Sequence, residues 1–243
     1  MGRNKPLLPD SKKGESTVNG DQYSTIATAL SMVGMIARGG FRVRPDDAVP
    51  PLGDGRAART VVIAGNAGPA MWRAFRADIR PGPDPLDRWC RSVLAEIAKE
   101  IGAGLVLPSD GPPYAPFQRW AMRAEAVFIS PLGLLIHPKW GLWHGYRGAF
   151  LVGEPFDVPP REAGQSPCES CPEKPCLTTC PVGAFTGEDY RVDDCTAYLH
   201  RPDGSSCLTG GCRARRACPV GKNHLPEPDQ AGFHMQAFLA SRP

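Results

Sequence analysis

Eight of the nine cysteines in the chain lie between residues 168 and 218, and their spacing is the strongest chemical signal in the sequence. They form two arrays, Cys168-x2-Cys171-x4-Cys176-x3-Cys180-Pro181 and Cys195-x11-Cys207-x4-Cys212-x5-Cys218-Pro219. Clustered thiolates are ligands for soft metal centres, either iron–sulfur clusters or structural zinc. The pattern therefore predicts a metal-binding module in the last third of the chain.

Both arrays end in Cys-Pro-Val-Gly and approximate the bacterial ferredoxin run C-x2-C-x2-C-x3-C-P, whose fourth cysteine ligates the other cluster. The first array has two additional residues between its second and third cysteines, and the inner spacings of the second array are stretched throughout. The crossing pattern predicts two 4Fe-4S clusters. One would be held by Cys168, Cys171, Cys176 and Cys218, and the other by Cys180, Cys195, Cys207 and Cys212.

Two other interpretations of the cysteines stay open. Two all-cysteine zinc sites would use the same eight ligands, and a single cluster would leave four cysteines idle. The proline after each final cysteine favours iron, because it belongs to the ferredoxin pattern and zinc spacing does not require it. The basic residues between the last two ligands could hydrogen-bond sulfur, dock an acidic electron donor or simply be solvated, and the aromatic residues are expected to pack the module: Arg213, Arg215, Arg216, Phe185, Tyr190 and Tyr198.

Charge and hydropathy narrow the cellular context of the 243-residue chain. Its 28 basic and 25 acidic side chains leave a formal net charge of +3, which favours neither a nucleic-acid partner nor a polybasic membrane anchor. Residues 1–6 lead into no apolar secretory segment, and no apolar run reaches the roughly 18 residues that cross a bilayer. We therefore expect a cytoplasmic protein with reduced thiols, no membrane contact and no nucleic-acid partner.

Hydrophobic periodicity predicts a mixed helical and sheet domain before the cysteines. Residues 1–21 are polar and aperiodic and are expected to form a disordered tail. Helices are expected over 23–37, with Gly39-Gly40 as the stop signal, and over 70–77, 85–101 and 117–126; strands are expected over 41–44, 60–65, 104–108 and within 127–152. Cys90 lies on the apolar face of the 85–101 helix and is expected to be a core thiol. Residues 158–167, rich in proline and small or polar residues, are the expected linker.

The residues before the linker carry a second pattern. Residues 130–152 read SPLGLLIHPKWGLWHGYRGAFLV. This segment resembles the cobalamin-processing decyanase/dealkylase family, whose members carry an Ile-His-Pro-basic-aromatic-Gly run that ends in Arg-Gly before a hydrophobic strand; residues 156–160 extend the match. Residues 192–199, VDDCTAYL, resemble the cysteine module of epoxyqueuosine reductase and the reductive dehalogenases.

Both resemblances imply one architecture of the α+β class. A nitroreductase-like α/β sandwich domain over residues 22–160 would be the candidate cobalamin-binding domain, and a ferredoxin-like module over residues 161–243 would hold two 4Fe-4S clusters. The chain departs from these families in three respects. It has no Asp-x-His-x-x-Gly run for a cobalt-ligating histidine, no twin-arginine signal, and too few residues after Cys218 for the helical repeats with which epoxyqueuosine reductases hold tRNA.

The resemblance also implies a candidate corrinoid pocket, made of Ile136, His137, Trp140, Trp143, His144, Tyr146 and Arg147. The aromatic residues would pack over the macrocycle, and Arg147 with His144 would meet its amide periphery or an anionic cosubstrate. Gln118 and Trp120 are weaker candidates for the opposite wall. The alternatives are ordinary core packing for the two tryptophans and a hydrogen-bonded turn for His137.

The predicted function is an iron–sulfur oxidoreductase that takes electrons from a low-potential donor and passes them through two clusters to a corrinoid. It would process cobalamin or use it to reduce a small substrate. A buried site wired to low-potential clusters suits such chemistry, because the protein supplies orientation and solvent exclusion while the corrin reacts. Two alternatives stay open: a ferredoxin-like electron carrier without a corrinoid, and an FMN-binding nitroreductase-like enzyme.

Overall fold

The computed structural model describes residues 21–242, so the predicted tail lies outside the described residues except for Asp21. The first part of the chain combines helices with a four-stranded sheet, which confirms the mixed class. Its elements are α1 (Asp21–Met32), β1 (Ile36–Arg42), the 3-10 helix η1 (Pro45–Asp47), β2 (Thr60–Ala67), α2 (Ala70–Ala77), α3 (Pro85–Glu100), β3 (Gly104–Val106), α4 (Phe117–Ala124), β4 (Phe128–Ile129), β5 (Leu135–Ile136) and β6 (His144–Val152).

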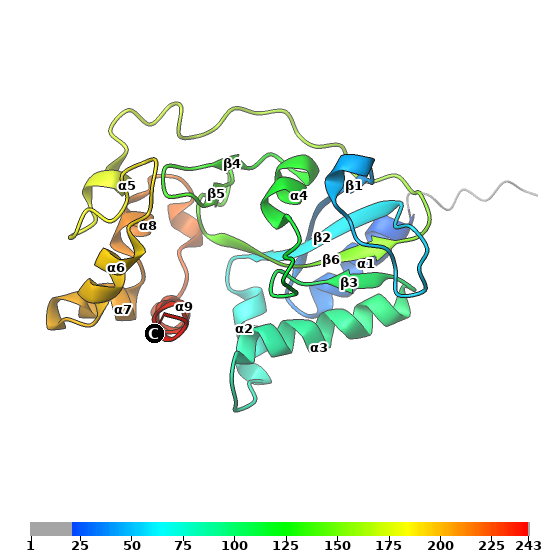
Figure 1. Ribbon diagram of the computed structural model, residues 1–243, viewed down its shortest axis with the longest axis horizontal. Coiled ribbons are helices and arrows are strands. Elements are labelled where there is room, and N and C mark those ends of the chain that lie inside the picture. Colours follow the sequence, from blue (N-terminus) through cyan, green and yellow to red (C-terminus); the bar gives the residue numbers. More distant parts are fainter. Residues whose placement is uncertain (1–20, 243) are drawn as a thin grey trace, which may run out of the picture.

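The main sheet has the order β1-β2-β6-β3, and each neighbouring pair is antiparallel. Successive strand side chains point to opposite faces, so Val62, Ala64 and Phe150 pack with α1, α2 and α3. Val61 and Ile63 pack with α4 on the other face. Figure 1 shows α3 and α4 on opposite sides of the sheet. Because helices cover both faces, β2 is apolar along most of its length instead of alternating.

The predicted helix over residues 23–37 is too long. Helix α1 ends at Met32, Gly34 adopts a left-handed backbone conformation (φ 71°), and β1 begins at Ile36. Gly39-Gly40 is therefore no helix stop but an irregularity inside β1, where the register against β2 shifts. A Cβ on Gly39 would lie 2.4 Å from the carbonyl oxygen of Ala124, so the strand packs closely under the end of α4.

The remaining elements form a small helical module that holds the clustered cysteines. They are α5 (Pro175–Thr178), α6 (Val192–Leu199), η2 (Pro202–Gly204), α7 (Ser205–Gly210), α8 (Arg213–Ala217), η3 (Lys222–His224) and α9 (Pro228–Ala240). The connection from β6 to α5 crosses the outside of the molecule, along the top of Figure 1. Arg161 anchors it, because its Nε donates to the carbonyl oxygens of Met122 and Glu125 at the end of α4.

The module contacts the sheet domain in several places. The backbones of Trp140-Gly141 and Val220-Gly221 approach so closely that a Cβ on Gly141 would lie 2.1 Å from the carbonyl oxygen of Val220. At the other end, Asp229 of α9 accepts a hydrogen bond from Trp72 Nε1 of α2 (3.1 Å), and Phe233 packs on the same tryptophan. Helix α9 thus folds back on the sheet domain.

No helix among residues 21–242 is long and apolar enough to span a membrane.

Candidate functional site

The clustered cysteines separate into two groups, each around its own small cavity. One cavity is lined by Cys168, Cys171, Cys176 and Cys218, and the other by Cys180, Cys195, Cys207 and Cys212. The cysteine that ends each array therefore lies with the first three cysteines of the other array. All nine cysteines are free thiols, and Cys90 lies in the sheet-domain core, where burial raises its pKa to about 11.

The surroundings of the thiols are largely apolar with a few hydrogen-bond donors. Burial raises the pKa of Cys176, and its neighbour Cys218 adds to this effect. In the second group, Ala184 donates its N–H to Cys180 Sγ (3.3 Å) and the Tyr190 hydroxyl donates to Cys195. Within residues 21–242, no three Cys, His, Asp or Glu side chains converge to hold a single metal ion. The four thiols of each group line one cavity.

A third cavity, of about 260 Å³, lies between the sheet domain and the module; we call it the inter-module cavity. The sheet domain contributes the ends of β2 and β6, and the module contributes the start of α8 and one face of α9. Cys212 lines both this cavity and that of the second cysteine group. The lining residues are Asn66, Gly68, Trp143, His144, Arg147, Gly211, Cys212, Arg215, His224, Pro226, Gln230, Ala231, His234 and Met235.

Arg215 lies near Cys212 of the second cysteine group and, like Trp143, lines the inter-module cavity. Its guanidinium lies 4.6 Å from the centroid of the Trp143 ring, and its Nε donates to the carbonyl oxygen of Leu142 (3.1 Å). Burial lowers the pKa of Arg215 to about 10, and the nearby Arg147 contributes to the decrease. Burial also lowers the pKa of His234 to about 4, and the positive charges of Arg147 and Arg215 add to this decrease. This histidine is therefore neutral at pH 7.

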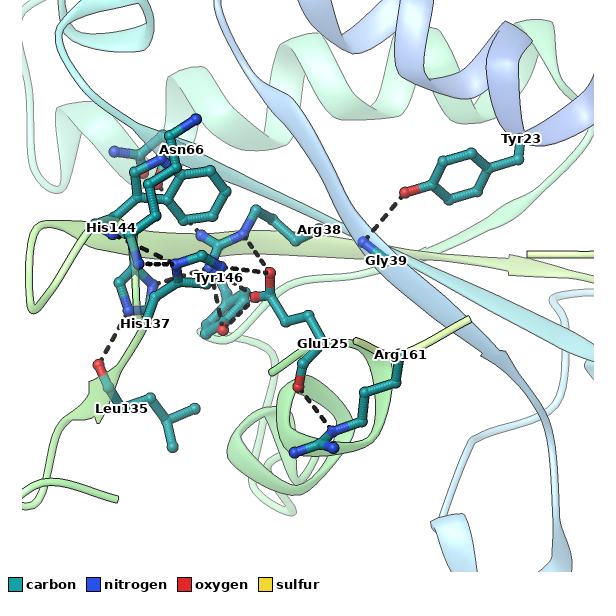
Figure 2. A network of polar contacts seen from close by, with 12 residues as sticks. Tyr23, Arg38, Gly39, Asn66, Glu125, Leu135, His137, His144, Tyr146 and Arg161 are labelled. Carbon is teal, nitrogen blue, oxygen red and sulfur yellow. Dashed lines mark hydrogen bonds and ion pairs between the residues drawn. The ribbon is translucent and has the colours of Figure 1, made fainter. Parts of the chain in front are cut away.

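A buried polar network, shown in Figure 2, shares Asn66 and His144 with the cavity lining. Its centre is Arg38 of β1, whose side chain is completely buried. Arg38 binds the Glu125 carboxylate through two nitrogens, Nη2 to Oε1 at 2.6 Å and Nε to Oε2 at 3.0 Å. The Tyr146 hydroxyl donates to the same carboxylate (2.6 Å), and the Arg38 guanidinium lies over the rings of Trp140 and Tyr146. We call this group, with His137 and His144, the Arg38 network.

Hydrogen bonds determine the tautomers of the two histidines in the network. His144 Nδ1 accepts from Arg38 Nη2 (3.2 Å), so its Nε2 carries the proton and donates to the carbonyl oxygen of Leu135 (3.0 Å). His137 Nδ1 accepts from the backbone N–H of Lys139 (3.0 Å). Burial, followed by Arg38, lowers the pKa of His144 to about 3 and of His137 to about 4. Both rings are therefore neutral at pH 7.

The predicted corrinoid-pocket residues divide among three places. Trp143, His144 and Arg147 line the inter-module cavity, and Ile136 lines the cavity of the first cysteine group. His137, Trp140 and Tyr146 belong to the Arg38 network. Of the weaker candidates, Trp120 is a core residue whose Nε1 donates to the Asp47 carbonyl, and Gln118 is exposed. Neither lines the cavity, because α4 packs on the other face of the sheet.

Several residues of the site carried no signal in the sequence. Arg38, Asn66 and Glu125 stand in three different elements, and only the fold brings them together. Asn66 joins the two regions, because its carbonyl oxygen faces Arg38 (3.5 Å) and its Oδ1 accepts from Arg147 Nε (2.9 Å). Gln230 and His234 of α9 lie beyond the last cysteine, where no motif pointed.

No family model matches the chain, and no curated protein sequence matches it. Solved structures do match. A reductive dehalogenase associated with B12-dependent dehalogenation aligns with a TM-score of 0.56 at 14% identity, over 98% of this chain and 38% of its own length. The B12-trafficking protein CblC of C. elegans aligns with a TM-score of 0.55 at 13% identity, over 90% of this chain and 95% of its own. An epoxyqueuosine reductase aligns with a TM-score of 0.54 at 15% identity, over 87% of this chain and 71% of its own length.

At these identities the matches establish a shared fold. They include the three kinds of protein that the sequence resembles, so the predicted resemblance is confirmed at the level of the fold. Two of the three neighbours are enzymes by their descriptions, and two are associated with B12. The chain thus has the fold of redox and B12-handling proteins.

Proposed function

We propose that this chain is an iron–sulfur oxidoreductase that passes electrons through two 4Fe-4S clusters to a corrinoid in the inter-module cavity. Its parts would be a nitroreductase-like domain over residues 22–160 and a ferredoxin-like module over residues 161–243. One observation carries the proposal: Cys212 belongs to the second cysteine group and also lines the inter-module cavity. A redox centre at that group would adjoin whatever the cavity binds.

The cysteine groups fit 4Fe-4S clusters, since each supplies the four thiolates such a cluster needs. When bound, the clusters supply one-electron transfer. The chain's own residues tune it: the Tyr190 hydroxyl and the Ala184 N–H donate to sulfur ligands of the second group, and hydrogen bonds to sulfur influence cluster potential. Cys168 and Cys171 of the first group line an open surface groove, where we expect a low-potential donor to dock.

The lining of the inter-module cavity fits part of a corrinoid. Ala231 and Met235 contribute apolar atoms to the lining, and Asn66, Arg147 and Gln230 offer polar groups to the amide periphery of a macrocycle. A cavity of about 260 Å³ is slightly smaller than typical ligand sites of about 300–1,000 Å³, so the rest of the molecule would extend over the open side. When bound, a corrinoid supplies a reducible cobalt centre. The Arg38 network supports the cavity wall through Asn66 and His144.

The first experiment is anaerobic purification with iron, sulfide, zinc and cobalt quantified, followed by a cobalamin titration monitored by visible absorption. We expect about eight irons per chain, the content of two cubanes, and a spectral shift on cobalamin addition. Stoichiometric zinc without iron would contradict the cluster assignment. Full iron without a corrinoid response would favour the electron carrier, and release of a yellow cofactor on denaturation would favour the FMN enzyme.

Single-cysteine variants test the crossed ligand assignment. Cys176→Ala and Cys207→Ala should each lower the iron content to about four per chain by removing a ligand from a different cluster. Cys90→Ala is the matched control, because Cys90 is buried in the sheet domain away from both groups and should leave the iron unchanged. Electron paramagnetic resonance of the reduced variants would then report a different surviving cluster in each.

A further inference from the structure

The inter-module cavity has an unbalanced charge. Arg147 and Arg215 reach it from opposite sides, and no aspartate or glutamate lines it. Neither arginine forms an ion pair with any residue between 21 and 242. The nearest acidic residues of α9 are engaged elsewhere: Asp229 accepts from Trp72, and Glu227 pairs with Arg73. Apart from the Cys212 thiol beside Arg215, the described residues therefore offer neither arginine an anionic partner.

One buried polar group in the same lining lacks a partner. Trp143 is 7% exposed, and its buried Nε1–H has no hydrogen-bond acceptor among residues 21–242. Gln230 lies in the same lining, and its side-chain amide can both donate and accept. Buried polar groups are nearly always satisfied, so the unpaired Trp143 N–H indicates a ligand that supplies the missing partner. Trp143 can only donate, which requires a ligand with an acceptor.

The geometry points to an oxyanion site: we propose that a phosphate or carboxylate group of a ligand binds between Arg147 and Arg215, within reach of Trp143 and Gln230. The two guanidinium groups are close enough to repel each other, and an anion between them turns this repulsion into two attractions. Arg147 commits only its Nε to the protein, through Asn66, which leaves its terminal nitrogens for the ligand. Guanidinium groups bind such oxyanions with paired, charge-assisted hydrogen bonds.

Two sources offer this chemistry. One is the phosphodiester in the nucleotide tail of a complete corrinoid, and the other is a separate small anionic co-substrate. Only the first source rests on the proposed function. The oxyanion site itself stands on the charges of the cavity and its unpaired Trp143 N–H, so the two ideas can fail independently.

The test titrates inorganic phosphate into the iron-loaded protein by anaerobic calorimetry, at low ionic strength in a buffer free of carboxylates and sulfonates. We expect one phosphate per chain and an increase in Tm. Arg147→Gln should weaken binding by about tenfold or more, since it removes charge-assisted hydrogen bonds. Arg147→Lys keeps the positive charge but not the planar guanidinium group, so its phosphate affinity should lie between those of wild type and Arg147→Gln.

Arg216→Gln is the matched control, because Arg216 is exposed on the same short helix as Arg215 and its loss changes the net charge equally. Equal weakening by Arg216→Gln and Arg147→Gln would overturn the site in favour of general charge attraction. A second variant guards against misfolding of Arg147→Gln. Gln230→Glu places a carboxylate inside the cavity, so it should abolish phosphate binding and raise Tm without phosphate; unchanged phosphate binding would overturn the proposal.

Two corrinoids distinguish the sources. If phosphate competes with complete cobalamin but not with a corrinoid that lacks the nucleotide tail, the site holds the tail phosphate. If phosphate binds without displacing either corrinoid, the site holds a separate anionic co-substrate. If phosphate binds and neither corrinoid does, the proposed function fails and the oxyanion site stands.

Discussion

Arg38 and Arg147 lie on strands β1 and β6 of one sheet and share Asn66, yet their surroundings are opposite. Arg38 is fully buried, and a bidentate carboxylate neutralises it within the protein. Arg147 is half-buried, has no carboxylate partner among the described residues, and faces another arginine across a cavity. The difference separates two uses of buried charge. The ion pair of Arg38 stabilises the fold, whereas the unpaired charge of Arg147 is available to a ligand.

The largest expected effect comes from removing the acid of the Arg38 network. Glu125→Gln leaves Arg38 buried without a counter-charge, which costs about 3–5 kcal/mol. For a chain of this size, that corresponds to a decrease in Tm of roughly 6–20 °C, measurable by circular dichroism. Asp157→Asn is the control, because it breaks the exposed Arg42–Asp157 pair and should cost less than about 1 kcal/mol. Similar losses in both variants would remove the distinction drawn for Arg38.

A smaller loss is expected from the hydroxyl that donates to the same carboxylate. Tyr146→Phe keeps the ring under Arg38 but removes the 2.6 Å hydrogen bond to Glu125, which should cost about 1.5–3 kcal/mol. Tyr114 is 65% exposed, so Tyr114→Phe should leave the thermal midpoint unchanged. A Tyr146→Phe protein as stable as wild type would show that the network tolerates missing members.

The pH dependence of stability should also report the network. His144 has a folded-state pKa of about 3, lowered by burial and then by Arg38, against about 6.5 in the unfolded chain. Below pH 6.5 the unfolded chain binds a proton that the folded chain refuses, so stability is lost by about 1.4 kcal/mol per pH unit down to about pH 3. Melting curves at pH 7.5 and 5.5 should differ less in His144→Gln than in wild type. The same change at exposed His200 should leave the wild-type pH dependence intact.

The smallest effect on stability is expected on the cavity side. Arg147→Gln leaves no carboxylate behind and relieves repulsion on Arg215, so Tm should stay within about 2 °C of wild type, or rise. Together with the loss of phosphate binding, this result would place Arg147 among the binding residues. A decrease as large as that of Glu125→Gln would instead make Arg147 a structural charge.

Local patterns predicted α2, α3 and α4 of the sheet domain well, because their apolar faces repeat at helical spacing, whereas no helix of the cysteine module was predicted. Helix α2 matches its expected range, and α3 ends one residue before the expectation. The failure at β1 has a tertiary cause. Met35 and Ile36 continue the helical spacing of α1, but Gly34 turns the chain and a close approach to α4 places Gly39-Gly40 inside a strand.

The site shows the same division. The grouping of the cysteines could be predicted from spacing, since a short motif and its crossing rule are local in the sequence. The Arg38 network did not follow, because Arg38 and Glu125 are far apart in the chain and neither stands in a motif. The wall made by Gln230 and His234 depends on α9 folding back onto α2 through Trp72 and Phe233, a contact that no local signal encodes.

The crossing of the two arrays also has a consequence for biogenesis. The last member of the second group in the sequence is Cys212. The first group begins with Cys168, but its last member is Cys218, the last cysteine of the chain. As the chain leaves the ribosome, the group that begins first is therefore completed last. Its final cysteine, Cys218, directly precedes the Pro219-Val220-Gly221 segment, which packs against Trp140-Gly141 of the sheet domain. The cluster that we propose for this group would therefore be completed at the point where the module docks on the sheet domain.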